Sequence, residues 1–403
     1  MTMDDTDKDA AEILSPVAAT SRIASLDVMR GLAVLGILAV NVVSFGLPVM
    51  VYQDASLSPF PVIGANAVAR WTMDVFFHQK FITLFGGERD DAARGKLLRR
   101  RLFWLAVIAL IHGLAFWYGD VLLLYAWSGL FVMLMRSMRA GTLIGIGLGV
   151  TLLLGAMQAG ATWLMVAGPP AITEAMNQGG PHYTAAMVTE SIAAYRSGWT
   201  GAMGQNLQNW LLLQGASLTM FVFSTVALMM LGLGLFKAGV FSGRAPNGVY
   251  VALIGVGGAV LALLGVLEWR EALAPAGTHP TRGLAEVVAS FPVFVTLAYV
   301  SLIVLATTRG LAWITAALRP VGQMAFTNYL TQTLIMTSIF YMPWGPRLFG
   351  RVDYVQMWGL VLAVWALQLI WSPLWLSRFS MGPLEWVWRC LTYGRRVPIS
   401  KGG

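Results

Sequence analysis

The first long apolar segment of the chain, from Ser25 to Pro48, places the strongest limit on what the protein can fold into. A run of about twenty apolar residues forms a helix long enough to cross a hydrocarbon core of about 30 Å. Three strongly polar side chains interrupt it, namely Asp27, Arg30 and Asn41. At 100° per residue, Arg30 lies one turn beyond Asp27, and Asn41 returns to within about 20° of Arg30. Because polar side chains are costly in lipid, we expect this face to point into a helix bundle.

Two roles are open for these polar residues. Asp27 and Arg30 could neutralise each other at the membrane boundary, while Asn41 hydrogen-bonds to a neighbouring helix. Alternatively, at least one of the three belongs to a binding or catalytic site.

The overall composition indicates a polytopic membrane protein. Of the 403 residues, 57% are hydrophobic and only 11% are charged, which excludes an ordinary soluble protein. The formal net charge is +8, but the basic residues stand between apolar segments, where they act as orientation signals, so no nucleic-acid partner is expected. The single Cys390 excludes a disulfide within the chain. Four dispersed histidines give no zinc-binding spacing, so no metal is expected.

Apolar runs bounded by charged residues, Pro or Gly predict an all-α protein with about ten transmembrane helices. The predicted spans are 28–50, 70–87, 101–118, 120–137, 142–167, 208–236, 248–268, 286–307, 320–343 and 355–377. Most Lys and Arg residues fall on the side that holds the N-terminus, so the positive-inside rule places both termini in the cytoplasm. The densest basic groups, at 89–101 and 378–401, could also bind anionic lipid or a phosphorylated cofactor.

This topology divides the chain into three parts. Residues 1–21 are acidic and have no basic region leading into an apolar one, which predicts a disordered, uncleaved cytoplasmic tail. Residues 22–378 form the transmembrane domain, with an outer loop at 169–207 that could contain a short helix at 185–195. Residues 379–403 combine aromatic side chains with Glu385 and Arg389, which is typical of a cytoplasmic interfacial helix followed by a tail.

Five polar or ionisable residues are predicted to lie at similar depth in the outer half of the membrane: Asn41, Asp74, His78, His112 and Tyr125. Asp74 and His78 are four residues apart on one helix face, where the carboxylate can hold the imidazole tautomer and raise its basicity. Such a layer offers a base, an orienting carboxylate and hydrogen-bond donors for acyl or proton transfer. Each histidine could instead be a neutral imidazole bonded to a neighbouring helix backbone.

Three further residues are candidate substrate contacts. Asp120 follows a sharp turn and suits either a helix N-cap or a catalytic acid. Asn328 and Gln332 lie four residues apart on one face of an apolar helix. They either bond to neighbouring helices or line a cavity.

Five blocks of residues, spread from residue 22 to about 396, carry a family resemblance. They are Leu26-Asp27 with Arg30-Gly31 and Asn41; Lys80-Phe81 with Leu84-Phe85-Gly86; His112 with Gly119-Asp120 and Tyr125; the run from Gly322 to Leu330; and the run from Gly382 to Trp386 with Arg389 and Leu391-Thr392-Tyr393. In these blocks the chain resembles the bacterial YeiB-like membrane proteins, the domain of unknown function 418. That family usually has a longer apolar run after the Lys-Phe pair, so the second span is short here.

The first block is also similar to the opening of transmembrane acyltransferases, including the heparan-glucosaminide acetyltransferases. Those enzymes transfer an acyl group from cytoplasmic acyl-CoA to a hydroxyl or amine. By this resemblance Asp27 and Arg30 would shape the inner end of the donor site, Asn41 would orient the acyl group, and a histidine would act as base. The related enzymes carry a histidine soon after the first helix, whereas residues 48–61 contain none, so His112 takes that role by its depth alone.

The sequence thus predicts a multi-pass protein of the bacterial inner membrane that acts on a small molecule. A second copy of the chain, in a homodimer, is a candidate partner. As an acyltransferase, it would use His112, or His78 oriented by Asp74, to deprotonate a hydroxyl or amine of a small molecule or envelope glycan. Asn41 or Tyr125 would then polarise the thioester of acyl-CoA, the expected co-substrate.

Two other functions use the same polar layer. A transporter or exporter of a small metabolite would employ it for binding and proton relay, although no internal repeat or broken helix pair is evident in the sequence. The similar depth of His78 and His112 also permits a bis-histidine haem.

Overall fold

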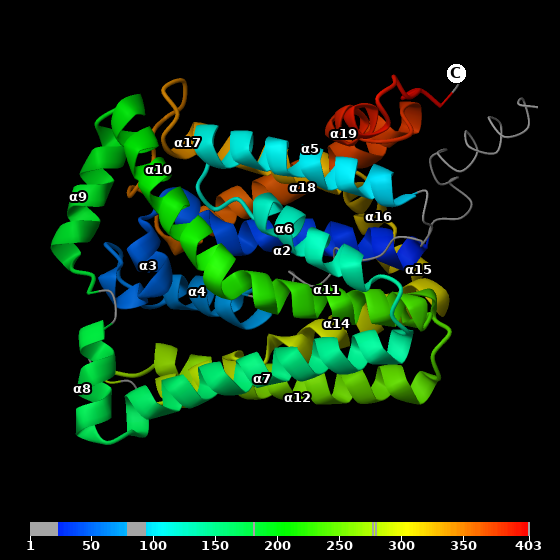
Figure 1. Cartoon of the computed structure of the whole chain (residues 1–403). Helices are drawn as coiled ribbons and strands as arrows, with labels where there is room; N and C mark the ends of the chain where they lie inside the picture. Colours follow the sequence, from blue (N-terminus) through cyan, green and yellow to red (C-terminus); the bar gives the residue numbers. More distant parts are fainter. Residues whose placement is uncertain (1–22, 79–93, 180–181, 276–277, 279, 402–403) are drawn as a thin grey trace, which may run out of the picture.

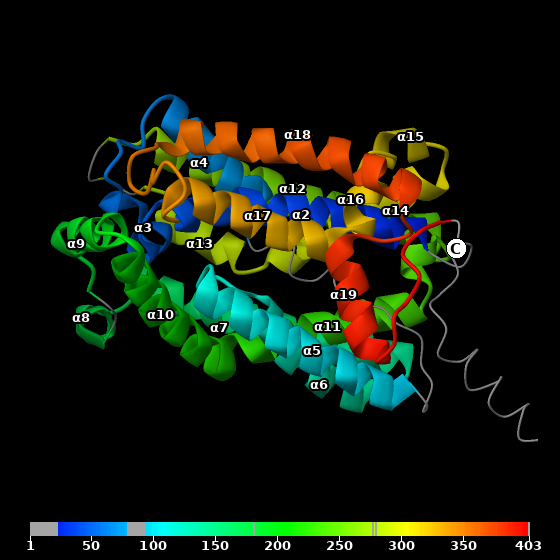
Figure 2. The same ribbon diagram turned by 90° about the horizontal axis from the view of Figure 1, so that it is seen from above.

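The computed structural model describes residues 23–78, 94–179, 182–275, 278 and 280–401, and within these residues the chain is helical and forms no β-sheet. The predicted all-α class is confirmed. The longer helices run side by side between two ends, with α19 and the C-terminal segment at one end and α8 and α9 at the other (Figure 1 and Figure 2).

The principal helices have the following bounds: α2 (Ala24–Gly46), α3 (Val49–Gln53), α4 (Ala65–Phe76), α5 (Arg94–Ala115), α6 (Leu122–Met135), α7 (Ala140–Ala167), α8 (Pro170–Gly179), α9 (Ala185–Arg196), α10 (Trp199–Ala216), α11 (Val222–Lys237), α12 (Asn247–Ala272), α13 (Arg282–Ala289), α14 (Pro292–Thr308), α15 (Ala312–Thr315), α16 (Leu318–Gln323), α17 (Ala325–Phe340), α18 (Tyr354–Arg378) and α19 (Pro383–Tyr393).

Five helical stretches are long and apolar enough to cross a membrane, and a sixth is added if the bent pair α13 and α14 counts as one span. The five are α2, α7, the continuous stretch Trp199–Lys237, α12 and α18. The chain is therefore a membrane protein. Each of the ten predicted spans contains helix in its described part, but α4, α6 and α17 are short and α5 begins with a basic turn. Of the predicted span 70–87, the structure describes only the part up to His78. The Lys80-Phe81 block and the predicted tail 1–21 therefore lie outside the described residues.

The first apolar segment forms α2, which lies at the centre of the bundle. It packs against α14, α16, α17 and α18, and most of its side chains are buried. Only glycine fits where α2 crosses α16, because a Cβ on Gly31 would overlap the carbonyl oxygen of Leu318 and one on Gly322 would overlap that of Asp27. Small residues at such a crossing allow two helix backbones in a membrane to approach closely.

Two predicted spans, 286–307 and 320–343, are broken, which corrects the expectation that no helix pair is interrupted. The axes of α13 and α14 differ by 56°. Pro292 accounts for this break, since proline has no N–H to continue α13 and disfavours helical backbone at the preceding Phe291. The second break lies at Met324, between α16 and α17.

The sixth predicted span and the outer loop before it also differ from expectation. The span begins at Trp199 instead of residue 208, and α10 passes into α11 through a π-helical turn at Ser217–Phe221. Such turns bend helices, and Figure 1 shows α10 and α11 running in different directions. The predicted loop 169–207 is largely helical, and α9 occupies the stretch where a short helix was expected.

A carboxylate from α19 holds the N-terminus of α17 at the second break. Glu385 Oε1 accepts hydrogen bonds from the backbone N–H groups of Phe326 (2.8 Å) and Thr327 (3.1 Å), and Oε2 accepts one from the Thr327 hydroxyl. A carboxylate in this position satisfies N–H groups that have no partner within the helix and complements the positive end of the helix dipole. Glu385 therefore anchors α19 to α17.

The crossing of α2 and α16 gives a first prediction. Replacing Gly322→Ala should destabilise the protein by about 1–3 kcal/mol or more, because the new methyl group meets backbone atoms that cannot move aside. The matched control is Gly359→Ala in α18, where a Cβ meets nothing within 4 Å and the change should be neutral or stabilising by less than about 1 kcal/mol. Thermal unfolding in detergent measures both variants. Equal unfolding temperatures for the two would contradict the close crossing.

Burial of Glu385 gives a second prediction. Desolvation raises the pKa of this carboxyl, and hydrogen bonds from Thr327 and Phe326 offset the effect only in part. The folded state therefore holds the proton more tightly than the unfolded state, whose pKa is near 4.5, so the stabilising contribution is present below pH 4.5 and is lost as pH rises through the folded-state pKa. The Tm of the wild type should fall relative to that of Glu385→Gln between pH 4.5 and neutral pH. A Tm difference that stays constant or changes in the opposite direction would refute this.

Candidate functional site

His112 and Asp120 form a buried hydrogen-bonded pair across the turn between α5 and α6. His112 Nδ1 lies 2.8 Å from Asp120 Oδ1, and Asp120 Oδ2 accepts a hydrogen bond of 2.9 Å from the backbone N–H of Leu123. Asp120 thus satisfies an N–H group in the first turn of α6, as expected for a capping residue, and also orients the imidazole. The sequence predicted these two residues separately but did not pair them.

The second imidazole nitrogen of His112 meets a hydroxyl from a distant part of the chain. Nε2 lies 2.9 Å from Thr333 Oγ1 on α17. Since an ionised carboxylate can only accept, we assign the proton to Nδ1, which makes Nε2 the acceptor of the Thr333 hydroxyl. The three side chains Asp120, His112 and Thr333 therefore have the order of donors and acceptors found in a Ser-His-Asp triad.

This group of three side chains is enclosed by aromatic residues. His112 is 3% exposed, Asp120 is 2% exposed and Thr333 is 1% exposed. The ring of Tyr329 lies 5.4 Å from the imidazole, centroid to centroid, and that of Trp117 lies 6.5 Å from it. The surroundings are thus of low dielectric, where hydrogen bonds and charges interact strongly.

Three buried donors near the pair find no hydrogen-bond acceptor among the residues that the structure describes: Trp117 Nε1, Trp210 Nε1 and Tyr329 Oη. Trp117 and Tyr329 border the imidazole ring, and Trp210 packs against Gly113, the residue after His112. Leaving a buried donor unsatisfied costs about 1–3 kcal/mol. Several such donors beside one histidine are a feature of sites that receive an oxygen atom from a substrate.

The other residues of the predicted polar layer take no part in the hydrogen bonds that join His112 to Asp120 and Thr333. Within the described part of the chain, none of the hydrogen bonds of His112 reaches Asn41, Asp74 or His78. Tyr125 is buried in the same cluster of side chains as Tyr329.

Asp74, His78 and Asn41 have surroundings of their own. Asp74 accepts a hydrogen bond of 3.1 Å from Arg70 Nε, and the Arg70 guanidinium also donates to the hydroxyl of Tyr354. The ring of His78 packs edge-on against Tyr52. Asn41 is half-buried on α2. The predicted pairing of Asp74 with His78 stays a prediction.

Asp27 and Arg30 form an ion pair, as the first of the two proposed roles requires. Arg30 Nη1 lies 3.2 Å from Asp27 Oδ1, and Gln323 Nε2 donates to Asp27 Oδ2 at 3.1 Å. The pair therefore also binds α2 to α16, at the crossing where Gly322 touches Asp27.

Asn328 and Gln332 form hydrogen bonds between helices. Asn328 donates to Val321 O and to Ser372 Oγ, and accepts from Trp371 Nε1. Gln332 donates to Val34 O on α2 and to Gln368 Oε1 on α18. These partners favour helix packing over cavity lining for this pair.

Two kinds of cofactor site can be compared with this geometry. Within the described residues, no group of three or more His, Cys, Asp or Glu side chains lies close enough to hold a metal ion. Both ring nitrogens of His112 are engaged by Asp120 and Thr333, which leaves neither for the bis-histidine haem considered from the sequence.

Sequence reasoning missed Thr333. It identified the run up to Gln332 but considered only the face with Asn328 and Gln332. Tyr329 and Thr333 repeat the same four-residue spacing about 100° further round the helix, on the face that meets His112. Reading both faces of this helix would have found them.

Comparisons with known proteins place the chain in a family. The sequence profile of a family described as protein of unknown function (DUF418) matches residues 235–395, which include Thr333 and Glu385. The uncharacterised protein YeiB of Escherichia coli is 30% identical over 94% of this chain and 98% of its own length. The chain belongs to the YeiB-like DUF418 family. The family resemblance predicted from the sequence is thereby confirmed.

Two further uncharacterised bacterial proteins are similar to this chain, one over nearly its whole length and one over a short part of it. The uncharacterised YxaH of Bacillus subtilis is 28% identical over 96% of this chain and 98% of its own length. An uncharacterised 39.9 kDa protein of Bacillus acidopullulyticus is 45% identical over 20% of the chain. No solved structure matches this chain.

The contact between His112 and Thr333 gives a third prediction. Thr333→Val removes the hydroxyl and leaves Nε2 of a buried imidazole without a partner, so it should cost about 1–3 kcal/mol of stability. Thr331→Val on the same helix is the control, because the Thr331 hydroxyl donates only to carbonyl groups of its own helix. Thermal unfolding in detergent should show the larger loss for Thr333→Val. An equal loss would mean that the hydrogen bond to His112 contributes nothing.

Proposed function

We propose that this protein is a membrane acyltransferase that transfers an acyl group from acyl-CoA to a hydroxyl or amine of a small molecule or envelope glycan. The observation that carries the proposal is the hydrogen-bonded order Asp120, His112, Thr333 in a buried site. This arrangement supplies a base with a fixed tautomer, which is what acyl transfer to a hydroxyl requires.

The proposed reaction uses His112 Nε2 as the base. Threonine in a helix has two favourable rotamers, because its hydroxyl can also bond to a carbonyl of the preceding turn. Rotation of Thr333 would allow the acceptor hydroxyl to take its place against Nε2. The acceptor oxygen then attacks the thioester carbonyl while its proton passes to Nε2. When the carbon–sulfur bond breaks, the CoA sulfur leaves and takes that proton from the imidazolium.

Three side chains would stabilise the charges that develop in this reaction, the positive charge on the imidazole and the negative charge on the carbonyl oxygen. Asp120 stabilises the imidazolium, as the acid of a triad does. The Tyr329 hydroxyl and the Trp117 indole N–H, both without an acceptor in the described part of the chain, would donate to the carbonyl oxygen. They replace Asn41 and Tyr125, which the sequence suggested for that role.

The membrane topology belongs to the same proposal. We infer ten crossings of the bacterial inner membrane, both termini in the cytoplasm, and α19 at the cytoplasmic interface. The amphipathic sequence of α19 and the basic residues at the start of α5 support this orientation. Asp27 and Arg30, at the start of α2, would then lie near the cytoplasmic side of the membrane, from which acyl-CoA arrives. A homodimer stays part of the proposal.

A transporter of a small metabolite is the second candidate. The observation that favours it is the interruption of two helices, the 56° bend between α13 and α14 and the break at Met324. Transporters often build their substrate sites from helices interrupted in this way.

Asp120→Asn gives a fourth prediction, which tests the enzyme. The amide keeps one oxygen for Leu123 N–H and turns its NH₂ towards His112 Nδ1, which forces the proton onto Nε2 and removes the base. In Ser-His-Asp enzymes the wrong tautomer lowers kcat by about 10⁴, and we expect a loss of that order here. The control is Asp353→Asn, because Asp353 caps α18 through Gln356 N–H and asparagine caps equally well.

The measurement combines binding with turnover. Acetyl-, succinyl- and longer-chain CoA are added to purified protein in detergent, and thermal shifts are recorded. A ligand at 100 times its Kd stabilises by about 2.7 kcal/mol. Release of free CoA thiol in the presence of membrane extract, as the source of acceptor, reports transfer. No shift with any acyl-CoA, together with no thiol release, would overturn the proposal and favour transport.

A further inference from the structure

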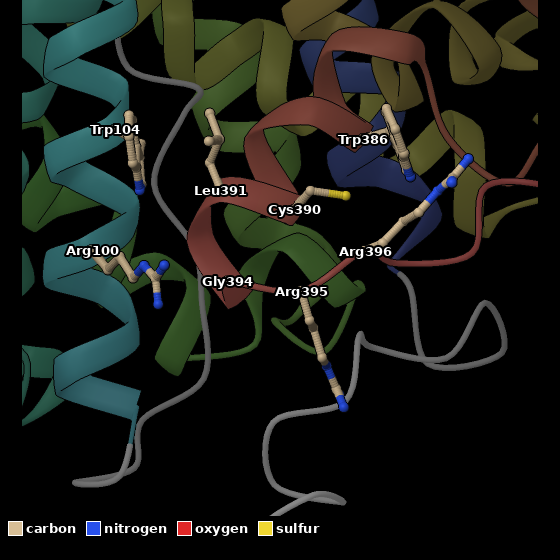
Figure 3. Close-up of a pocket in the computed structure, with 8 residues that line it drawn as sticks. All are labelled: Arg100, Trp104, Trp386, Cys390, Leu391, Gly394, Arg395 and Arg396. Carbon is tan, nitrogen blue, oxygen red and sulfur yellow. The ribbon is translucent and has the colours of Figure 1, made fainter.

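A basic pocket of about 440 Å³ lies between α5 and α19, at the end of the bundle that carries the C-terminal segment (Figure 3). Three arginines and two tryptophans are among its lining residues: Arg100 and Trp104 from α5, Trp386 from α19, and Arg395 and Arg396 from the segment after α19. The pocket is distinct from the site around His112, and the function proposed above does not use it.

α19, which forms one side of the pocket, packs against α5 through Trp388. The indole N–H of Trp388 donates to Arg101 O at 3.1 Å, and the Arg101 guanidinium lies 4.4 Å from the Trp388 ring centroid. Cation–π contacts of this kind add to the packing of the two helices. The width of the pocket is therefore fixed by contacts outside it.

The segment after α19 is fixed as well. Trp386 Nε1 donates to Val397 O at 2.6 Å, and Val397 N–H donates to Cys390 Sγ. Gly394 ends α19 with a φ of 69°, which favours glycine, and a Cβ there would lie 2.8 Å from the Arg100 guanidinium. The chain thus turns back so that Arg395 and Arg396 follow directly beyond the point where Arg100 reaches α19.

The positive charge of this pocket is not neutralised by the described part of the protein. Within it, none of Arg100, Arg395 and Arg396 forms an ion pair with a carboxylate. The acidic residue of α19, Glu385, directs its carboxylate to the N-terminus of α17. Figure 3 shows Arg100 extending from α5 towards Gly394, and Arg396 extending towards Trp386. All three arginines are exposed, and Figure 3 shows Arg395 extending away from Arg100 and Arg396, so an anion from the solvent can reach each guanidinium group.

We propose that this pocket binds the phosphate of an organic phosphate ester. Guanidinium groups match phosphate oxygens with paired hydrogen bonds, and several of them around one cavity favour a multiply charged phosphate. The tryptophan rings of Trp104 and Trp386 provide apolar walls for the organic part. Two sources supply this chemistry at a membrane surface, a soluble nucleotide such as CoA and the headgroup of an anionic phospholipid.

Phosphate binding at this pocket does not depend on acyl transfer, but a bound phosphate ester would bear on the proposed reaction. Arg100 and His112 lie on the same helix, twelve residues and therefore about 18 Å apart. A ligand whose phosphate is bound at Arg100 would therefore have to extend about 18 Å along α5 to meet His112. If the ligand is a nucleotide, the pocket would anchor the donor of the proposed reaction.

The experiment gives the fifth prediction and measures binding alone. Adenosine 3′,5′-bisphosphate, with adenosine as uncharged control, is titrated into detergent-purified protein, following tryptophan fluorescence. Native mass spectrometry of protein from nanodiscs with and without phosphatidylglycerol detects retained lipid.

The variants are Arg100→Gln and the double change Arg395→Gln with Arg396→Gln. Arg319→Gln on α16 is the matched control, being an exposed arginine outside the pocket. Gel filtration confirms that each variant is folded, and Arg100→Lys, which keeps the charge, should retain part of the affinity.

We expect each pocket variant to weaken phosphate binding at least tenfold, while Arg319→Gln leaves it unchanged. Binding of the bisphosphate but not of adenosine identifies a soluble ligand; retention of phosphatidylglycerol alone, lost in the same variants, identifies a lipid. Absence of both, or binding that the pocket variants do not weaken, overturns the inference. Asp120→Asn protein should bind as the wild type does, so that failure of acyl transfer and failure of this site are distinguishable.

Discussion

The structure depends on one constraint, that a polar group inside a membrane bundle must find its partner within the bundle. The centre of the protein meets it by joining three helices. Gln332 of α17 donates to a carbonyl of α2 and to Gln368 of α18, and Gln368 in turn donates to Asn328 O. The Trp365 indole N–H of α18 donates to Leu35 O on α2. Because these hydrogen bonds fix the face of α17 that carries Asn328 and Gln332, the adjacent face with Tyr329 and Thr333 is held towards His112.

The same helices connect the two ends of the molecule. α5 carries Arg100 near one end and His112 near the other, and α17 carries Thr333 while its N-terminus is held by Glu385 of α19. The pocket and the His112 site are therefore built on shared rigid elements. Glu385 is the side chain that joins α19, at the pocket, to α17, at the His112 site.

The sequence predicted most of the helices and only part of the site. Apolar length is enough to locate a buried helix, so α2, α7, α12 and α18 lie close to their predicted bounds. The break at Met324 was not predictable in this way, because the groups that satisfy the free N–H donors of α17 come from Glu385, far along the chain. His112 and Asp120 were each identified from local pattern, whereas their pairing depends on the conformation of the turn between them. Thr333 is an ordinary residue in a helix and becomes part of the site only through packing.

The unsatisfied donors beside His112 bear on which kind of function suits the site. A site that only passes protons has no need of the Tyr329 hydroxyl or the Trp117 N–H, since the imidazole and its two partners complete the relay among themselves. A carbonyl oxygen that gains negative charge needs such donors, and preorganised ones are most effective where water is excluded. Their cost in the free protein, about 1–3 kcal/mol each, would then be offset by the interaction with the transition state. On this reasoning we favour acyl transfer over transport.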